Sequence, residues 1–230
     1  MRRKFLGFFG AVAFTALTLA SGAHAAQKTW TEGKHYAVLS PVQKTTVPAG
    51  KIEVLEVFSY GCSACNSFQP VIEQLKTSLP AKAQMAYLHA SFRPDESWHI
   101  FQRAYYAARS LKVDERTHQA VFDAIWKTGE LSIVDPGTRK LRKPQPTIED
   151  AARCYSRLTG IKEEDFLAAT RSFNVDAQMR AADAQVRAMQ VPGTPCLVVN
   201  GKYRVVMDDI ASIDELVGVV KFLVDKESGK

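Results

Sequence analysis

The sequence is short of the residues and patterns that identify many functional classes. It contains four cysteines among 230 residues, and its five histidines are scattered without the spacing of metal ligands. No internal repeat or low-complexity tract is present, and after the N-terminal segment no apolar run reaches the roughly 20 residues that a membrane-spanning helix needs. Nothing in the sequence therefore indicates a metal or other cofactor, a repeat protein or a second membrane span.

A strong excess of one charge is also missing. The formal net charge is +6, but Arg2, Arg3 and Lys4 supply three of those charges, and residues 1–25 contain no acidic side chain. Without that segment the chain would carry only +3. We therefore draw no inference of nucleic-acid binding from the charge.

The first 25 residues have the three parts of a secretory signal peptide. A basic start is followed by an apolar run, Phe5 to Ala20, and then by small residues that end in Ala23-His24-Ala25. An uncleaved anchor is the alternative, but glycines and threonines interrupt the run, which is shorter than a spanning helix. We expect cleavage after Ala25 and a periplasmic location, where disulfide bonds persist.

Two hydrophobic periods alternate along the rest of the chain. Short apolar runs predict buried strands, and apolar residues three and four apart predict amphipathic helices. The helix after the first strand contains Pro70, which is expected to kink it. The expected elements are strands at 51–58, 83–90, 196–200 and 203–207, a hairpin turn at Asn200-Gly201, a helix after the first strand, a helical block over about 95–190 and a last helix at 213–224.

A basic, proline-rich segment from Asp135 to Pro146 interrupts the helical block and predicts an exposed loop. On either side of the block lie the strands and helices of a small α/β unit. The order of the elements therefore predicts an α/β domain into which a block of helices has been inserted.

The stretch GCSACNSF, residues 61–68, places two cysteines three residues apart at the strand-to-helix junction. Free N–H groups and the dipole at a helix N-terminus stabilise negative charge, so we expect an exposed thiolate of lowered pKa at Cys62. Cys65 is expected to be more deeply placed and to resolve a mixed disulfide formed at Cys62. In a compartment that permits disulfides, this pattern favours thiol–disulfide exchange over a zinc site.

Two further features fit such chemistry. Glu56 lies in the apolar strand that should run beneath the helix, where an acid could handle the proton of Cys65; an ordinary solvated strand residue is the alternative. Thr194-Pro195 could form a cis peptide bond beside the cysteines and pair with an extended substrate, although a trans turn is also possible.

These residues resemble the periplasmic thiol:disulfide oxidoreductases of the DsbA type. The resemblance rests on VLEVFSYGCSAC at residues 54–65, on Pro70, on the helical insertion and on TPCLVVNGKY at residues 194–203. It implies an α/β thioredoxin fold with a large inserted helical domain. The expected parts are a first thioredoxin-like part at 26–94, the insertion at 95–175 and a second thioredoxin-like part at 176–230.

The resemblance also implies the roles of individual residues. Cys62 would be the nucleophile, Cys65 the resolving thiol, Glu56 the buried acid and Thr194-Pro195 the cis-proline pair. Members of the family donate their disulfide to reduced, unfolded secreted proteins and are reoxidised by a membrane quinone-linked partner, DsbB. We expect a monomer that uses no cofactor or metal and binds no nucleic acid.

The sequence departs from the family pattern at two places. Ser63-Ala64 stands between the cysteines where the best-known members have Pro-His, and the missing histidine suggests a weaker oxidant. Tyr87 occupies the position at which the family often places a lysine opposite the buried acid. Proton handling at Cys65 is therefore expected to differ.

Cys154 and Cys196 remain if Cys62 pairs with Cys65. Cys196 should face away from the active cysteines, because successive strand residues alternate between faces. We expect a Cys154–Cys196 disulfide that ties the helical block to the α/β unit. Two buried free thiols are the alternative.

The remaining histidines and two aromatic residues near the cysteines have no catalytic role assigned from the sequence. His99 and His118 are expected on helix surfaces, and His89 in a strand without an assigned role. Tyr60 and Phe68 are candidate walls of an apolar groove around the cysteines.

Two other functions use the same fold. A disulfide isomerase of this compartment would carry an N-terminal dimerisation domain, for which the stretch between Ala25 and Cys62 is too short, and a dedicated reductase would lack the helical insert. A chaperone-like binding protein without redox activity is the alternative from another class. The loss or survival of its activity after Cys62→Ser distinguishes it from an oxidase.

Overall fold

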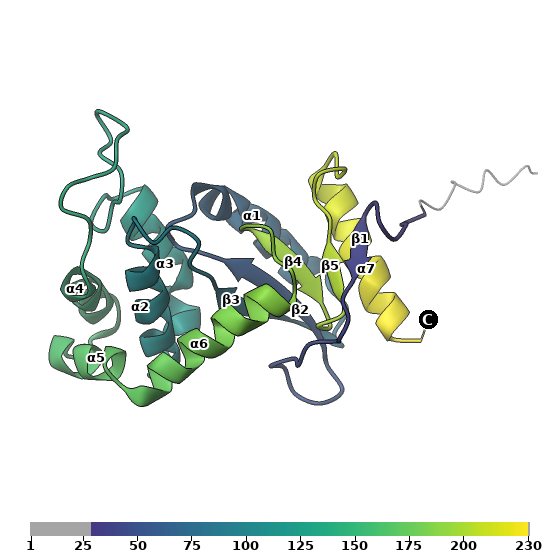
Figure 1. Cartoon of the computed structure of the whole chain (residues 1–230), viewed down its shortest axis with the longest axis horizontal. Coiled ribbons are helices and arrows are strands. Elements are labelled where there is room, and N and C mark those ends of the chain that lie inside the picture. Colours follow the sequence, from purple (N-terminus) through teal and green to yellow (C-terminus); the bar gives the residue numbers. More distant parts are fainter. Residues whose placement is uncertain (1–28, 230) are drawn as a thin grey trace, which may run out of the picture.

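The computed structural model describes residues 29–229, and the predicted signal peptide and its cleavage site lie outside these residues. A five-stranded sheet in the order β1-β5-β4-β2-β3 forms the centre of the α/β part (Figure 1). β2 runs parallel to β3 and antiparallel to β4. The strands are β1 (Tyr36–Val38), β2 (Ile52–Phe58), β3 (Ala83–His89), β4 (Cys196–Val199) and β5 (Tyr203–Val205).

The sequence of β2 explains its central place. All seven of its residues are buried, as expected for a strand that is covered on both faces. α1 (Ser63–Ser78) connects β2 to β3 and α7 (Ile213–Glu227) closes the chain, and both pack on one face of the sheet. The residues on this face belong to the cluster of Val54, Val71, Ile72, Leu75, Leu197, Val199, Leu216, Val220 and Leu223.

The hairpin between β4 and β5 forms where the Asn-Gly pair predicts it. Asn200 and Gly201 have φ angles of 52° and 63°, the left-handed pair that a two-residue hairpin needs. A Cβ at Gly201 would also lie 2.1 Å from the carbonyl oxygen of Gln43. Glycine is therefore required here for its backbone angle and for the close approach of the chain before β2.

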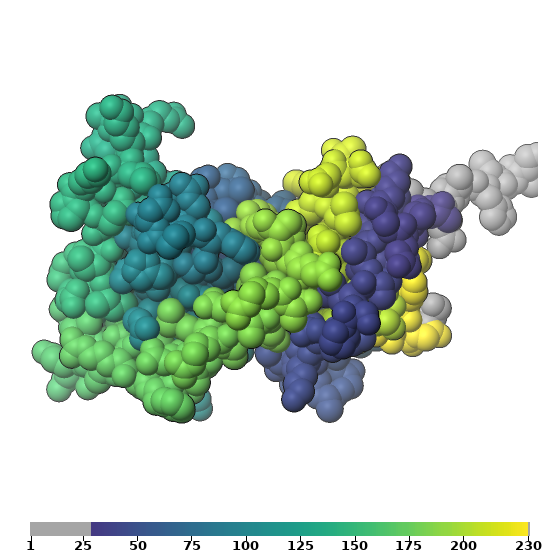
Figure 2. Space-filling view, in the orientation of Figure 1, coloured from purple at the N-terminus to yellow at the C-terminus, as the bar shows by residue number. Residues whose placement is uncertain are grey.

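The helical block packs against the end of the sheet that faces left in Figures 1 and 2. α6 runs obliquely from this block back toward the strands, so the two parts form one continuous body. The segment between α3 and α4, which includes the predicted basic loop, projects away from the helices, and residues 136–144 are exposed. The helices are α2 (Trp98–Ser110), α3 (Asp114–Trp126), α4 (Ile148–Thr159), α5 (Glu163–Thr170) and α6 (Phe173–Ala188).

Most sequence expectations for the fold are confirmed. One difference is β1, an additional edge strand that is too short for a hydrophobic period to reveal. Pro70 lies inside α1, as the sequence predicts, and its kink stays a prediction. The domain division at 95–175 stays a prediction, but its end falls inside α6, which is continuous from Phe173 to Ala188.

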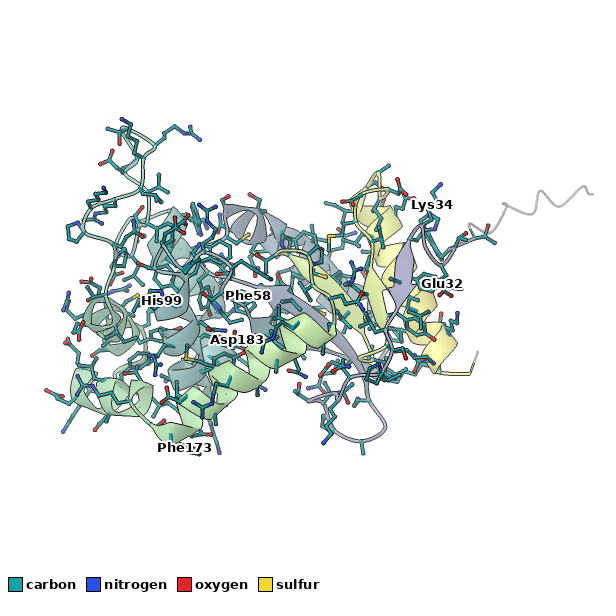
Figure 3. All side chains as sticks on the ribbon, in the orientation of Figure 1. Glu32, Lys34, Phe58, His99, Phe173 and Asp183 are labelled. Carbon is teal, nitrogen blue, oxygen red and sulfur yellow. The ribbon has the colours of Figure 1, made fainter. Side chains whose placement is uncertain are left out.

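Phe58 is the aromatic side chain at the centre of the junction between sheet and helices (Figure 3). It is fully buried, and its ring centroid lies 5.4 Å from that of Tyr105 and 4.9 Å from that of His118. Edge-on contacts of this kind add to the free energy of burial.

Phe58→Ala should lower the free energy of unfolding by about 3–5 kcal/mol, because it leaves a cavity at this junction. Urea unfolding followed by circular dichroism measures the change. Phe173→Ala is the matched control, because Phe173 is 80% exposed and should change the free energy by less than about 0.5 kcal/mol. Equal losses in the two variants would contradict this account of the junction.

Candidate functional site

The two cysteines lie where β2 ends and α1 begins. Cys62 is the N-cap of α1, and its sulfur accepts a hydrogen bond from the Cys65 backbone N–H at 3.3 Å. Cys65 lies one turn into the helix and is fully buried. The predicted position of the pair at the helix N-terminus is confirmed.

Gly61 allows the start of α2 to approach the cysteines. A Cβ at this position would lie 2.6 Å from two atoms of the Trp98 indole, and Trp98 in turn donates a hydrogen bond to Glu96. On the other side, the indole N–H of Trp126 donates to the Tyr60 carbonyl at 2.9 Å. Two tryptophans of the helical block therefore hold the loop that carries the cysteines.

The two thiols have opposite acidities. Hydrogen bonds lower the pKa of Cys62 to about 6, first from the Cys65 thiol and then from Thr194 and the backbone N–H groups of Cys65 and Ala64. Burial, with a smaller contribution from Cys62, raises the pKa of Cys65 well above its ordinary value. Near neutral pH the pair therefore holds one thiolate, at Cys62, and one protonated thiol, at Cys65.

The loop before β4 covers the nucleophilic sulfur. The Thr194-Pro195 peptide bond is cis, and the Cys62 thiol, in its protonated form, donates to the Thr194 carbonyl at 3.3 Å. The predicted cis bond beside the cysteines is thus confirmed. Cys62 is only 7% exposed, less than the sequence predicts, because this loop lies over it.

Glu56 lies beneath the cysteines in β2 and is fully buried. Neither of its carboxylate oxygens has a hydrogen-bond partner among the described residues. Burial raises the pKa of Glu56 to about 8, and this effect exceeds the lowering by Lys76. The alternative of a solvated strand residue is therefore wrong.

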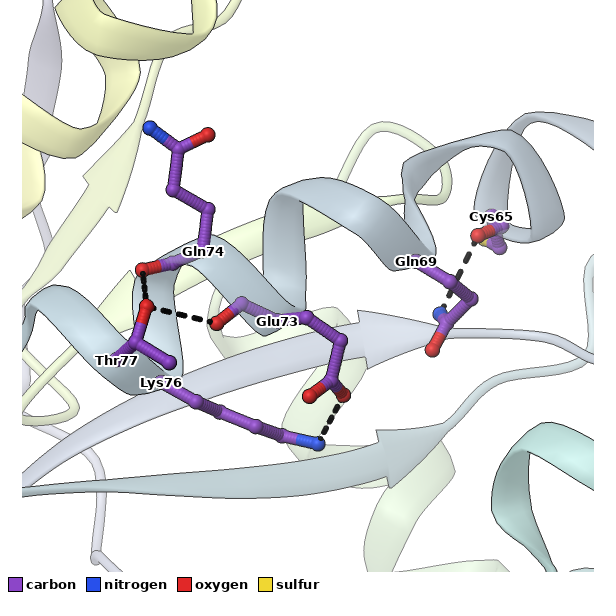
Figure 4. Close-up of polar contacts among 6 residues, drawn as sticks. All are labelled: Cys65, Gln69, Glu73, Gln74, Lys76 and Thr77. Carbon is purple, nitrogen blue, oxygen red and sulfur yellow. Dashed lines mark hydrogen bonds and ion pairs between the residues drawn. The ribbon is translucent and has the colours of Figure 1, made fainter.

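Tyr87 lies opposite Glu56 in the register of β2 and β3, as the sequence predicts. The cation near Glu56 comes instead from Lys76, near the end of α1. Lys76 is not among the residues predicted from the sequence, although a signal is present: positions 65, 69, 72 and 76 follow the helical period and so share one face of α1. Cys65, Gln69 and Lys76 are drawn in Figure 4.

His118 and Tyr60 lie deeper than the sequence predicts, and His89, for which no depth is predicted, is also buried. His118 is 8% exposed, so its expected place on a helix surface is wrong, whereas His99 is exposed as predicted. Tyr60 is fully buried and bonds through its hydroxyl to His118 Nδ1 at 3.1 Å, so it cannot form a groove wall. His89 is fully buried, and its Nε2 accepts the Tyr60 N–H at 3.1 Å. Burial lowers the pKa of each histidine to about 3, so both are neutral.

The predicted Cys154–Cys196 disulfide is not formed: all four cysteines are free thiols in this structure, and α4 lies in the helical block, apart from β4 in the sheet (Figure 1). Cys196 begins β4, where it pairs with Val57 on the sheet, whereas Cys154 lies in α4, which packs on α2, α3 and α5. The intervening helices separate the two elements. Burial raises the pKa of both thiols to about 11, which makes them poor nucleophiles.

No group of three or more His, Cys, Asp or Glu side chains in residues 29–229 is arranged to bind a metal ion. None of the helices in this part of the chain combines the length and apolar character that crossing a bilayer requires.

Cys65→Ala should raise the pKa of Cys62 by about one unit or more, because it removes the thiol donor that contributes most to the lowering. The ultraviolet absorbance of the thiolate, followed against pH in the reduced protein, measures this pKa. Cys196→Ala is the control and should leave the midpoint at about 6. An unchanged midpoint in Cys65→Ala would contradict the assignment.

Alkylation tests the state of the two remaining cysteines. The oxidised protein, unfolded without reductant, should accept one alkyl group each at Cys154 and Cys196, read by intact mass and peptide mapping. A protein that accepts no alkyl group before reduction would instead contain the disulfide that the structure contradicts.

Comparison with known proteins places this geometry in a family. The DSBA-like thioredoxin domain matches residues 53–220. DsbA of Pseudomonas aeruginosa is 33% identical, with 94% of each chain covered, and DsbA of Azotobacter vinelandii is 33% identical over 85% of this chain and 83% of that protein. Both carry the name thiol:disulfide interchange protein.

Solved structures agree with the sequence matches. The crystal structure of DsbA from Xylella fastidiosa has a TM-score of 0.73 at 28% identity and covers 87% of this chain and 98% of that one. That of P. aeruginosa DsbA has a TM-score of 0.70 at 34% identity, with 87% and 95% covered. The chain therefore belongs to the DsbA family of thioredoxin-fold thiol:disulfide oxidoreductases.

Proposed function

We propose that this protein donates the Cys62–Cys65 disulfide to reduced secreted proteins. The observation that carries the proposal is the opposite acidity of the two thiols at the N-terminus of α1. A stabilised Cys62 thiolate favours the reduced form of the pair, so the disulfide is a good electron acceptor. Release of Cys62 as a thiolate of low pKa also makes it a good leaving group.

The exchange needs two attacks. A substrate thiolate attacks Cys62, the bond to Cys65 breaks, and its electron pair passes to Cys65, which takes a proton from protonated Glu56. A second substrate thiol, as its thiolate, then attacks the substrate sulfur of the mixed disulfide and expels the Cys62 thiolate. The substrate gains a disulfide, and the two cysteines gain the two electrons.

The surface beside Cys62 suits an unfolded chain. A hollow of about 270 Å³ is lined by Thr194, Pro195 and Met207, and Met207 also lines an apolar hollow of about 310 Å³. The backbone before β4 can pair with an extended peptide, and the apolar hollow can accept its side chains. Phe68 keeps its predicted place on this wall, together with Val71, Ile210, Ile213 and Leu216.

The proposed setting follows from the family and from the N-terminal sequence. We assign the protein to the periplasm. The N-terminal signal peptide would direct its export and be removed by cleavage after Ala25. We expect the protein to act as a monomer. A DsbB-type membrane quinone reductase would return the cysteine pair to the disulfide. Ser63 and Ala64 are exposed and carry no charge, so hydrogen bonds rather than a neighbouring histidine stabilise the Cys62 thiolate.

Equilibration with reduced and oxidised glutathione tests the direction of transfer. The Cys62–Cys65 pair should be more oxidising than the glutathione couple, as read by alkylation and mass after acid quenching. The oxidised protein should also convert a reduced dithiol peptide to its disulfide, and Cys62→Ser should lose this activity. A strongly reducing pair would identify a reductase or isomerase, and an activity that survives Cys62→Ser would identify a binding protein.

A further inference from the structure

Four of the buried polar atoms that lack hydrogen-bond partners among the described residues lie on Tyr87 and on two residues next to it. They are both carboxylate oxygens of Glu56, the Tyr87 hydroxyl and Nε2 of His118. Glu56 and Tyr87 are partners in the register of β2 and β3, and the rings of Tyr87 and His118 lie 4.7 Å apart. Buried polar groups without protein partners usually bond to water.

A pocket of about 440 Å³ opens beside this cluster, at the edge of the sheet formed by β3. Tyr87 and His118 line it, although neither residue belongs to the substrate surface near Thr194. Its volume is sufficient for several water molecules. Lys76, Ala81, Tyr105, Asp114 and Glu115 also line it.

The cluster connects Cys65 to the pocket through neighbouring side chains. Glu56 contributes to the raised pKa of Cys65, which places the two within electrostatic range. Tyr87 lies beside Glu56 and at the pocket wall. The Lys76 ammonium lies 5.6 Å from the centroid of the Tyr87 ring and 2.6 Å from Oε1 of Glu73 (Figure 4). Lys76 therefore lies at the solvent end of this connection.

Lys76 is the cation of the pocket. His118 is neutral because burial lowers its pKa to about 3, and the other lining residues include no lysine or arginine. The ionisable groups that surround Glu56 and the pocket are Cys62, Cys65, Glu73 and Lys76 from α1 and its N-cap, Tyr87 from β3, Tyr105 and Arg109 from α2, and Asp114, Glu115 and His118 from α3; Arg109 donates to the Tyr87 carbonyl at 3.4 Å.

We propose that this pocket is the solvent connection of Glu56, and that Lys76 is the positioning residue that stabilises its carboxylate. The proposal rests on the proposed function, because Glu56 exchanges its proton with Cys65 only when the cysteines react. When Cys65 attacks a mixed disulfide at Cys62, its proton passes to the Glu56 carboxylate and leaves through the pocket. In the reverse step, water in the pocket returns the proton. The cation that family members often place on β3 is thus supplied here from α1.

Closure of a glutathione mixed disulfide tests this assignment. Reduced protein is mixed with oxidised glutathione, so that the Cys62 thiolate displaces glutathione and forms the mixed disulfide. Cys65 then attacks Cys62, releases the second glutathione and leaves its own proton with Glu56. Acid quenching and intact mass give the closure rate against pH. The midpoint of this profile reports the Glu56 base in the wild-type protein.

Lys76→Met keeps the aliphatic stem but removes the charge that favours the Glu56 carboxylate. Its midpoint should move upward by about half a pH unit or more, with closure slowed about threefold near neutral pH. Lys76→Arg should restore the wild-type profile. Lys221→Met is the matched control, since Lys221 is exposed on α7, and it should change nothing. Superimposable profiles for Lys76→Met and Lys221→Met would overturn the role of Lys76.

Two further variants separate a path through Glu56 from a general effect. Glu56→Gln should abolish the inflection of the closure rate against pH. In the double variant, Lys76→Met should cause no further change in the closure rate.

Ala81→Trp, which fills the pocket with an indole, should raise the midpoint of the profile although Lys76 is retained, because it dehydrates Glu56. An unchanged midpoint in Ala81→Trp would overturn the solvent connection. Failure of Cys62 to form the mixed disulfide would overturn the proposed function itself, and the present proposal with it.

Discussion

The chemistry of this protein depends on the hydrogen bonds that end at the Cys62 sulfur. That sulfur caps α1, and the hydrogen bond from the Cys65 thiol, followed by those from Thr194 and from the backbone N–H groups that begin the helix, lowers the pKa of Cys62 to about 6. The helix N-terminus leaves N–H groups without intrahelical partners, and a thiolate satisfies them better than a neutral side chain does. No charged side chain lies between the two cysteines. These hydrogen bonds therefore stabilise the Cys62 thiolate in place of a neighbouring histidine.

The rest of the structure keeps this cap in place and separates the two thiols. Trp98 and Trp126, both from the helical block, hold the loop from Ser59 to Gly61, and Phe58 anchors the end of β2 among aromatic rings. Thr194 covers Cys62 from the other side. The helical insertion therefore does more than enlarge the fold, because it fixes the backbone from which the capping sulfur projects.

Burial has opposite consequences for the groups beneath the cap. It keeps Cys65 protonated, and it raises the pKa of Glu56 to about 8, near the range in which a proton can be exchanged. A carboxyl group without hydrogen-bond partners destabilises the fold as pH rises from its unfolded pKa toward 8, because the folded state then binds more protons than the unfolded state. The protein thus keeps, beside the cysteines, an acid whose position lowers stability but serves proton transfer.

Local sequence determined the positions of most elements and the identity of the redox pair. Hydrophobic period places β2 and α1, the Asn200-Gly201 pair fixes the hairpin, and the GCSACNSF stretch puts Cys62 at a helix start, because each of these signals acts within a few residues. Contacts between distant segments were decided only by tertiary structure. Packing of α4 among helices keeps Cys154 away from Cys196, and packing of α3 on β3 buries His118. The approach of α1 to β3 brings Lys76 to Tyr87 and Glu56, a relation that depends on the angle at which a helix crosses a sheet and not on spacing along the chain.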